Sequence, residues 1–444
     1  MLAAHPLWMI GTIPFVALLL LIALLPLTPR TAKWWHSNAN KAIVALACAV
    51  ATAVYLLATD TVAATTNALL HTLLEEYIPF ITLLGSLFVI AGGISLRLGV
   101  RGTPAYNTAF LALGAIIASL LGTTGASVLL IRPLLEMNKH RRRVAHTVVF
   151  FIFAVSNIGG LLLPTGDPPL FLGYLRGIPF FWTLSLWAPW AFTLVLLLGA
   201  YFCIDQWMER GDTLVAQTLA PSPEPIPMRI EGCGNLLWLG GVLASVVLLV
   251  PGRPLVGTAW IVPAFAREGA MLALALVSLA TTPSRVRISG GFSWAPIVEV
   301  AVLFVGIFVA MQVPLAVLAE GGASGRVTSP SAYFWATGIL SSFLDNAPTY
   351  LVFLTSASVD VTAATASHIS LTDGRAIDAG ILAAISLGAV FMGANTYIGN
   401  GPNFMVKAIA EESGVPMPSF FGYMGWAIAV LIPVFVLVSF VFCR

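Results

Sequence analysis

The stretch SSFLDNAPTYLVF, from Ser341 to Phe353, places an acid, an amide and a proline inside an otherwise apolar sequence. The chain around it has 444 residues, of which 59% are hydrophobic and only 9% are charged. An average soluble domain carries about 25% charged residues. Because no soluble fold of this size can hide so many apolar side chains, we expect an all-α polytopic membrane protein.

Charge and motif content exclude several other classes. The net charge of +2 gives no sign of nucleic-acid binding, and no Walker motif indicates ATP-driven chemistry. The histidines are dispersed, and the four cysteines are far apart and are interpreted as free thiols. We therefore expect no enzymatic activity, no nucleic-acid partner, no cofactor and no metal beyond transported ions such as Na⁺ and H⁺.

Apolar runs long enough to cross a bilayer occur along the whole chain. A spanning helix needs about 20 apolar residues. Candidate spans lie near residues 7–28, 40–58, 77–98, 144–177, 181–203, 235–251, 264–281, 295–318, 376–410 and 422–442.

Two further segments, 106–135 and 330–355, are apolar at both ends and interrupted in the middle. The interruptions read LGTTGAS and SFLDNAP. Each limb is short for a comfortable span, so we expect two re-entrant hairpins that enter and leave on the same side.

The chain divides into two halves with the same order of segments: three spans, a hairpin, a long interrupted span and a final span. A polar, proline-rich stretch from Asp205 to Gly232 separates them. We expect a first repeat at 1–204, a cytoplasmic linker at 205–233 and a second repeat at 234–444. Because each half has an odd number of crossings, the two repeats are predicted to be inverted.

The basic residues indicate the orientation of this topology. Two thirds of the 21 Lys and Arg residues fall on the side opposite the N-terminus. The positive-inside rule identifies that side as the cytoplasm. We therefore expect an integral protein of a bacterial cytoplasmic (inner) membrane, with both termini outside.

The two long interrupted spans contain similar breaks. They read SNIGGLLLPTGDPPLF, residues 156–171, and GANTYIGNGPNFMV, residues 393–406, so that GDPPL aligns with GNGPN. No continuous helix tolerates such a run of Gly and Pro, so the backbone must unwind. In lipid this is tolerated only where the break is buried in protein or lines a wet cavity, and unwound carbonyls there suit small ions.

The hairpin tips are expected to meet these breaks. A helical limb that starts near Ser331 reaches Asp345 at a depth of roughly 21 Å, beyond the middle of a ~30 Å hydrocarbon core. By the same symmetry, the tip GTTGAS, residues 122–127, meets the break PTGDPP, residues 164–169. Two tips and two breaks would form one central site.

Asp345 is the most prominent candidate residue. A carboxylate at this depth costs several kcal/mol unless it is paired, hydrated or protonated, so a proton and a cation would compete for it. The alternative interpretation is a helix cap that accepts hydrogen bonds from backbone amides. Asp167 has the same two interpretations, although only the second hairpin carries an acid at its tip.

Amides and hydroxyls around the breaks complete the candidate site, each serving either the ligand or the local backbone. The amides are Asn157, Asn346, Asn395, Asn400 and Asn403, and the hydroxyls are Thr123, Thr124, Ser127, Thr165 and Thr349. The residues expected to break the helices are Pro348, Gly166, Pro168, Gly399, Gly401 and Pro402.

The motifs SSFLDNAPTYLVF and SNIGGLLLPTGDPP resemble signatures of the ion transporter superfamily. Within it they are most similar to NhaD-type sodium/proton antiporters and the related citrate transporters. The resemblance covers nearly the whole chain. It implies inverted repeats, re-entrant hairpins, discontinuous helices, a homodimer in the lipid bilayer and elevator-like alternating access.

The resemblance also assigns residues to the site. It implies that Asp345, Asn346 and Pro348 form the second tip. It further implies that the two breaks are lined by Asn157, Gly159, Thr165, Gly166 and Asp167, and by Asn395, Gly399, Asn400 and Asn403.

The tips differ from those of the dicarboxylate symporters of the superfamily, which carry Ser-Asn-Thr. Here the tips read Thr123-Thr124-Gly125 and Asp345-Asn346-Ala347. No Lys or Arg is predicted near the midplane, so citrate would depend on amides and a carried cation. Sodium/proton antiport is therefore the first hypothesis. The alternatives are cation-coupled citrate or dicarboxylate symport, and a channel or anion-extrusion subunit of an ATPase-driven pump.

Overall fold

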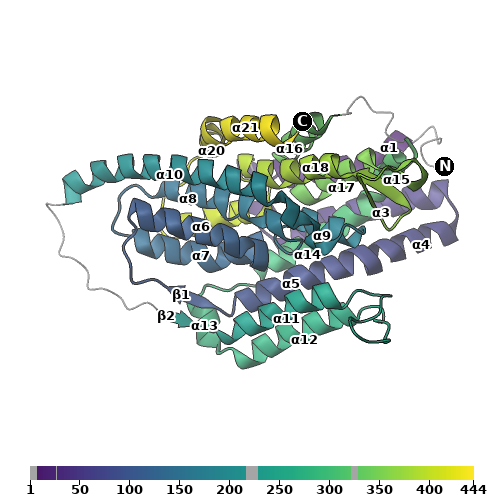
Figure 1. Cartoon of the computed structure of the whole chain (residues 1–444), viewed down its shortest axis with the longest axis horizontal. Helices are drawn as coiled ribbons and strands as arrows, with labels where there is room; N and C mark the ends of the chain where they lie inside the picture. The colour runs from purple at the N-terminus through teal and green to yellow at the C-terminus, as the bar shows by residue number, and fades with distance from the viewer. Residues whose placement is uncertain (1–7, 27, 217–228, 322–328) are drawn as a thin grey trace.

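The computed structural model describes residues 8–26, 28–216, 229–321 and 329–444. Helices dominate this part of the chain, and its strands form one two-stranded and one three-stranded sheet. The expected all-α polytopic architecture is confirmed. Figure 1 shows most helices running along the long axis of the molecule, with α11 and α12 on the opposite side from α20 and α21.

The first half contains the following elements: α1 (Trp8–Leu24), α2 (Pro29–Trp35), α3 (Asn38–Thr59), α4 (Val62–His71), η1 (Thr72–Tyr77), α5 (Ile78–Ala91), β1 (Ser95–Arg97), α6 (Pro104–Leu121), α7 (Thr123–Asn138), α8 (Ala145–Ala154), η2 (Ile158–Leu162), α9 (Pro168–Leu175), η3 (Phe180–Leu186) and α10 (Trp187–Ala216).

The second half contains β2 (Arg229–Glu231), α11 (Gly234–Leu248), α12 (Ala266–Thr281), α13 (Ser284–Ser289), α14 (Ala295–Ala310), α15 (Gln312–Gly321), α16 (Pro330–Ser341), α17 (Asn346–Ala357), β3 (Val359–Asp360), η4 (Val361–Ala363), β4 (His368–Ser370), β5 (Arg375–Asp378), α18 (Ala379–Met392), η5 (Gly393–Asn395), α19 (Gly401–Glu412), α20 (Phe420–Trp426), η6 (Ala427–Leu431) and α21 (Ile432–Phe442).

Six helices of the described residues are long and apolar enough to cross a membrane, or seven if the bent pair α14 and α15 counts as one. This number is lower than the ten expected crossings because several expected spans are shorter helices, such as Trp8–Leu24 and Gly234–Leu248. One expected span also begins earlier than predicted: the helix expected at 77–98 runs over Val62–Ala91.

The first limb of the first hairpin is longer than predicted from the sequence. Pro104–Leu121 alone meets the length and hydropathy of a span. It ends at Gly122, whose φ of 80° a residue with a side chain rarely adopts. The chain therefore reverses because of the turn at Gly122 and the burial of the tip. The length of the limb does not explain the reversal.

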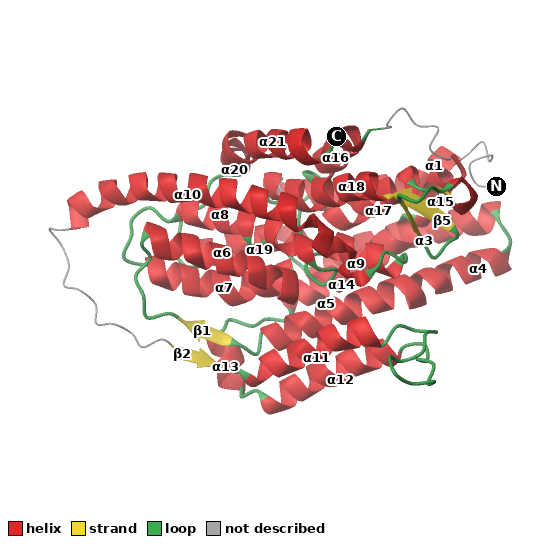
Figure 2. Cartoon of the chain, in the orientation of Figure 1, coloured by secondary structure: helices red, strands yellow, loops and turns green. Residues whose placement is uncertain are grey.

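Both hairpins begin with the same local signal, a capping hydroxyl followed by proline. Thr103 accepts a hydrogen bond from the Tyr106 amide at the start of α6, and Ser329 accepts one from the Ala332 amide at the start of α16. The following proline occupies the first helical turn, where its missing N–H costs nothing. Figure 2 shows α6 and α7 toward one end of the long axis, and α17 with β5 toward the other.

The expected linker at 205–233 is structured at both ends. Helix α10 continues to Ala216, and strand β2 pairs with β1 through Leu96 and Ile230. The residues between them, 217–228, lie outside the described part of the chain. Asp205, expected to start the linker, is instead a fully buried helical residue.

The helices form two bundles that pack mainly within themselves. The frame bundle comprises α1, α3, the helix Val62–Ala91, α11, α12 and α14. The site bundle comprises the hairpins α6/α7 and α16/α17, the broken helices α8–α9 and α18–α19, and α10. Few elements, notably α15, α5 and α9, connect the two bundles.

Candidate functional site

The first helix break places Asp167 directly before α9. Its backbone has the extended conformation of a helix cap, yet its side chain makes no capping hydrogen bond. The reason is local: Pro168 and Pro169 follow it and have no N–H to donate. The carboxylate can therefore accept hydrogen bonds from other parts of the chain. Asp167 is 1% exposed.

Three side chains from three other elements donate hydrogen bonds to this carboxylate. Thr123, at the first hairpin tip, donates its hydroxyl to Oδ1 at 2.8 Å. Asn346, at the second tip, donates Nδ2 to Oδ2 at 2.5 Å, and Asn400, at the second break, donates Nδ2 to Oδ1 at 3.3 Å. The two tips and two breaks thus meet at one residue, and all three donors are uncharged.

The donors occupy equivalent positions in the two halves. Thr123 and Asn346 are the first residues of α7 and α17, and Asp167 and Asn400 directly precede α9 and α19. Asn400, like Asp167, precedes a residue pair containing proline and makes no side-chain cap. The two halves therefore differ at one equivalent position, where the first half has the acid Asp167 and the second half has the amide Asn400.

Two serines that were not among the predicted site residues join the hairpins to the breaks. The Ser119 hydroxyl donates to the Gly159 carbonyl and accepts from the Leu162 amide. The Ser342 hydroxyl donates to the Met392 carbonyl at 3.1 Å. Their common position, three residues before Gly122 and before Asp345, is the signal that could have identified them.

Two of the predicted amides join the two breaks directly. Asn157 donates to Asn403 Oδ1 at 2.8 Å, and Asn403 donates to the carbonyls of Gly393 and Thr396, both at 2.9 Å. Asn403 thereby satisfies carbonyl groups of the unwound backbone, which is the structural one of the two predicted roles for these amides.

Of three further predicted hydroxyls, two join the first hairpin to the first break and one contacts the backbone of its own tip. Ser127 bonds Ser156 at 2.7 Å, Thr165 donates to the Ser119 carbonyl, and Thr349 donates to the Asp345 carbonyl at 3.0 Å. These groups support the tips and breaks.

Asp345 adopts the capping role. Its Oδ1 accepts from the Ala347 amide at 3.1 Å, at the start of α17. Unlike Asp167, it is followed by residues that have N–H groups. The geometry therefore favours the capping interpretation for Asp345 and the central position for Asp167.

Within the described part of the chain, two buried amide oxygens have no hydrogen-bond partner: Asn346 Oδ1 and Asn395 Oδ1. Most buried polar atoms in proteins are satisfied, so each requires an explanation. Asn346 is fully buried, and its other amide atom contacts Asp167. A carboxylate and a nearby carbonyl oxygen without a donor are the hard oxygen ligands that small cations prefer.

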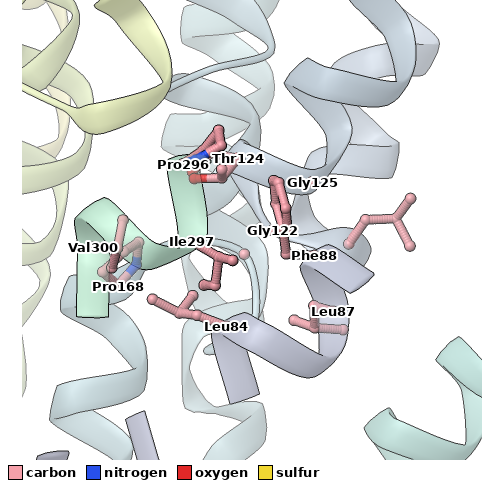
Figure 3. A pocket seen from close by; sticks show the side chains of 13 residues that line it. Leu84, Leu87, Phe88, Gly122, Thr124, Gly125, Pro168, Pro296, Ile297 and Val300 are labelled. Atoms are coloured by element: carbon pink, nitrogen blue, oxygen red, sulfur yellow. The ribbon is translucent and has the colours of Figure 1, made fainter. Parts of the chain in front are cut away.

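A small cavity lies beside the first hairpin tip. Figure 3 shows Leu84 and Leu87 of α5 and Ile297 and Val300 of α14 around the tip that carries Thr124. Gly166 and Pro168 of the first break also line this cavity, so it reaches the segment that carries Asp167. Its walls come from both the frame bundle and the site bundle.

A helical membrane protein in which two hairpins and two broken helices close around a buried acid has the construction of a transporter. A family model with the description "Putative citrate transport" matches residues 3–443, and the chain belongs to this family of transporters. No curated protein gives a significant match to the chain. The family match confirms the resemblance to ion transporters related to citrate transporters.

Proposed function

We propose that this transporter is a sodium/proton antiporter in which Asp167 binds H⁺ and Na⁺ in turn. The observation that carries the proposal is the burial of the Asp167 carboxylate among three uncharged donors, beside the unpartnered Oδ1 of Asn346. A buried carboxylate needs a neutralising partner. A proton or a sodium ion supplies that charge, and the two exclude each other.

Alternating access is the transport cycle that we propose for this site. From the hairpin onward, each half contains a helical hairpin, a broken helix and a final helical segment, and the hairpins lie toward opposite ends of the molecule (Figure 2). This arrangement supports inverted repeats, with the linker at the cytoplasmic face and both termini outside. Movement of the site bundle against the frame bundle would then expose Asp167 to each side, in a homodimer embedded in lipid.

Exchange in proteoliposomes tests the proposal. Purified protein is reconstituted with an internal pH dye, and an outward or inward Na⁺ gradient is applied. We expect Na⁺-dependent dissipation of the pH gradient in the wild type and its loss in Asp167→Asn. A wild-type protein that shows no sodium response in either direction would refute antiport.

Asp345→Asn is the matched control because asparagine also caps helices well. We expect it to retain exchange. If Asp345→Asn loses exchange and Asp167→Asn retains it, the coupling acid is Asp345.

Cation-coupled citrate uptake is the second candidate, and the family description favours it. The same vesicles, loaded with and without Na⁺ gradients, are tested with radiolabelled citrate. Citrate uptake that requires the protein and a cation gradient would establish symport.

A further inference from the structure

Helix α9 connects the candidate site to the frame bundle. Asp167 precedes its first residue and Arg176 follows its last. The helix has 8 residues, so it is about 12 Å long at 1.5 Å per residue. A short helix of this kind moves as one rigid piece, and a restraint at Arg176 also restrains Asp167.

Arg176 forms an ion pair with a residue of the frame bundle. Its Nη2 lies 2.8 Å from Oε1 of Glu76, and the two side chains are 23% and 8% exposed. Glu76 belongs to η1, the π-helical segment that interrupts the helix Val62–Ala91 before Pro79. Such segments shift the direction of side chains and are frequent at functional sites.

A second contact holds the same end of α9. The Tyr174 hydroxyl donates to the Val246 carbonyl of α11 at 2.9 Å. The guanidinium of Arg267, on α12, lies 5.8 Å from the centre of the Tyr174 ring. The frame bundle therefore contacts the end of α9 that is remote from Asp167.

We infer that Glu76 and Arg176 are positioning residues for transport: their ion pair holds α9 against the frame in the state in which Asp167 is enclosed by both tips and the second break. The inference rests on the proposed transport function. Neither residue contacts Asp167, so the pair acts through α9 by setting the population of this state. Loss of the pair lowers that population, and apparent affinity falls in proportion to it.

Removing the pair is expected to change apparent affinity more than maximal rate. Glu76→Gln should raise the half-saturating Na⁺ concentration about three- to tenfold, with the maximal exchange rate within about twofold of wild type. Arg176→Lys should restore most of the affinity that Arg176→Gln loses. The charge-swapped double variant Glu76→Arg/Arg176→Glu should recover affinity relative to either single substitution.

The control is Glu299→Gln, which removes an ion pair within the frame bundle. Glu299 lies 2.6 Å from Lys41 and joins α14 to α3. We expect no change in half-saturation. An unchanged affinity in Glu76→Gln, or an equal change in Glu299→Gln, would overturn the inference.

A second readout does not depend on ion flux. Spin labels are placed at Val62→Cys on α4, 69% exposed, and at exposed Ala366→Cys between α17 and β4 of the site bundle, after replacement of the native cysteines. Glu76→Gln should broaden the distance distribution or add a second distance, and Glu299→Gln should not. If the wild type fails to exchange sodium but the distances respond as expected, only the transported ion is wrong. If the distances are the same in Glu76→Gln and wild type, the positioning role is refuted.

Discussion

Two acids of similar sequence context have different roles because of the residues that follow them. Asp345 precedes Asn346 and Ala347, which have N–H groups, so its carboxylate caps α17. Asp167 precedes two prolines, so its carboxylate has no local amide to accept from and instead receives side chains from elsewhere. At the scale of single residues, the backbone N–H groups of the following residues decide the role of the acid. Where they are present the carboxylate caps the helix, and where prolines replace them it can bind other groups.

The capping role of Asp345 predicts that two substitutions at this position have unequal effects on stability. Asp345→Ala should lower the free energy of unfolding by about 1 kcal/mol, because alanine cannot cap. Asp345→Asn should leave it within a few tenths of a kcal/mol. Thermal unfolding in detergent measures both. Equal destabilisation by the two substitutions would show that the charge, and not the cap, stabilises the tip.

At the scale of elements, the hairpin tips depend on special backbone and on serine contacts. The first tip turns at Gly122 with φ of 80°, and the second turns at the Asp345 cap. Ser119 and Ser342 then fasten each hairpin to its break. Each half therefore forms a hairpin tip, the first with a glycine turn and the second with an aspartate cap.

Gly122→Ala tests whether the first tip requires the glycine turn. A side chain in this backbone conformation is strained by about 1–3 kcal/mol, and its Cβ would lie 3.3 Å from the Thr165 carbonyl oxygen. We expect a lower melting temperature and weaker exchange. Gly125→Ala is the control, since its Cβ would make an ordinary contact with Ala91 at 3.5 Å. A stable, active Gly122→Ala variant would show that the tip tolerates another turn.

At the scale of the whole molecule, a buried polar network closes the open end of the first hairpin. Asn107 of α6 and Asn138 of α7 exchange two hydrogen bonds of 2.9 Å. Asp205 of α10 accepts from Asn107 and pairs with Arg141 at 2.6 Å and with His146 of α8 at 2.7 Å. The network ties four helices together at the end of the hairpin remote from the site.

Asp205→Asn is expected to destabilise the protein strongly. It leaves the Arg141 charge buried without its partner, which costs about 3–5 kcal/mol. The control is Glu231→Gln, because its pair with Arg229 is largely exposed and should contribute at most about 1 kcal/mol. Chemical or thermal unfolding in detergent compares the two. Similar stabilities would show that the network does not fasten the hairpin.

The sequence by itself determined the membrane class, the two hairpins and the two breaks. These features follow from composition and from local Gly and Pro chemistry, which act over a few residues. It also contained the Asp-Pro-Pro signal that distinguishes Asp167 from Asp345, although depth and charge alone pointed first to Asp345.

Only the tertiary structure decided which side chains meet. The donors to Asp167 lie 44, 179 and 233 residues away in the chain, and the Glu76–Arg176 pair joins two different bundles. The candidate spans are all strongly apolar, so hydropathy carries little information on which helix packs against which. Those contacts depend on shape and on the burial of polar groups in the folded protein. They place the Asp167 carboxylate where side chains of both tips contact it.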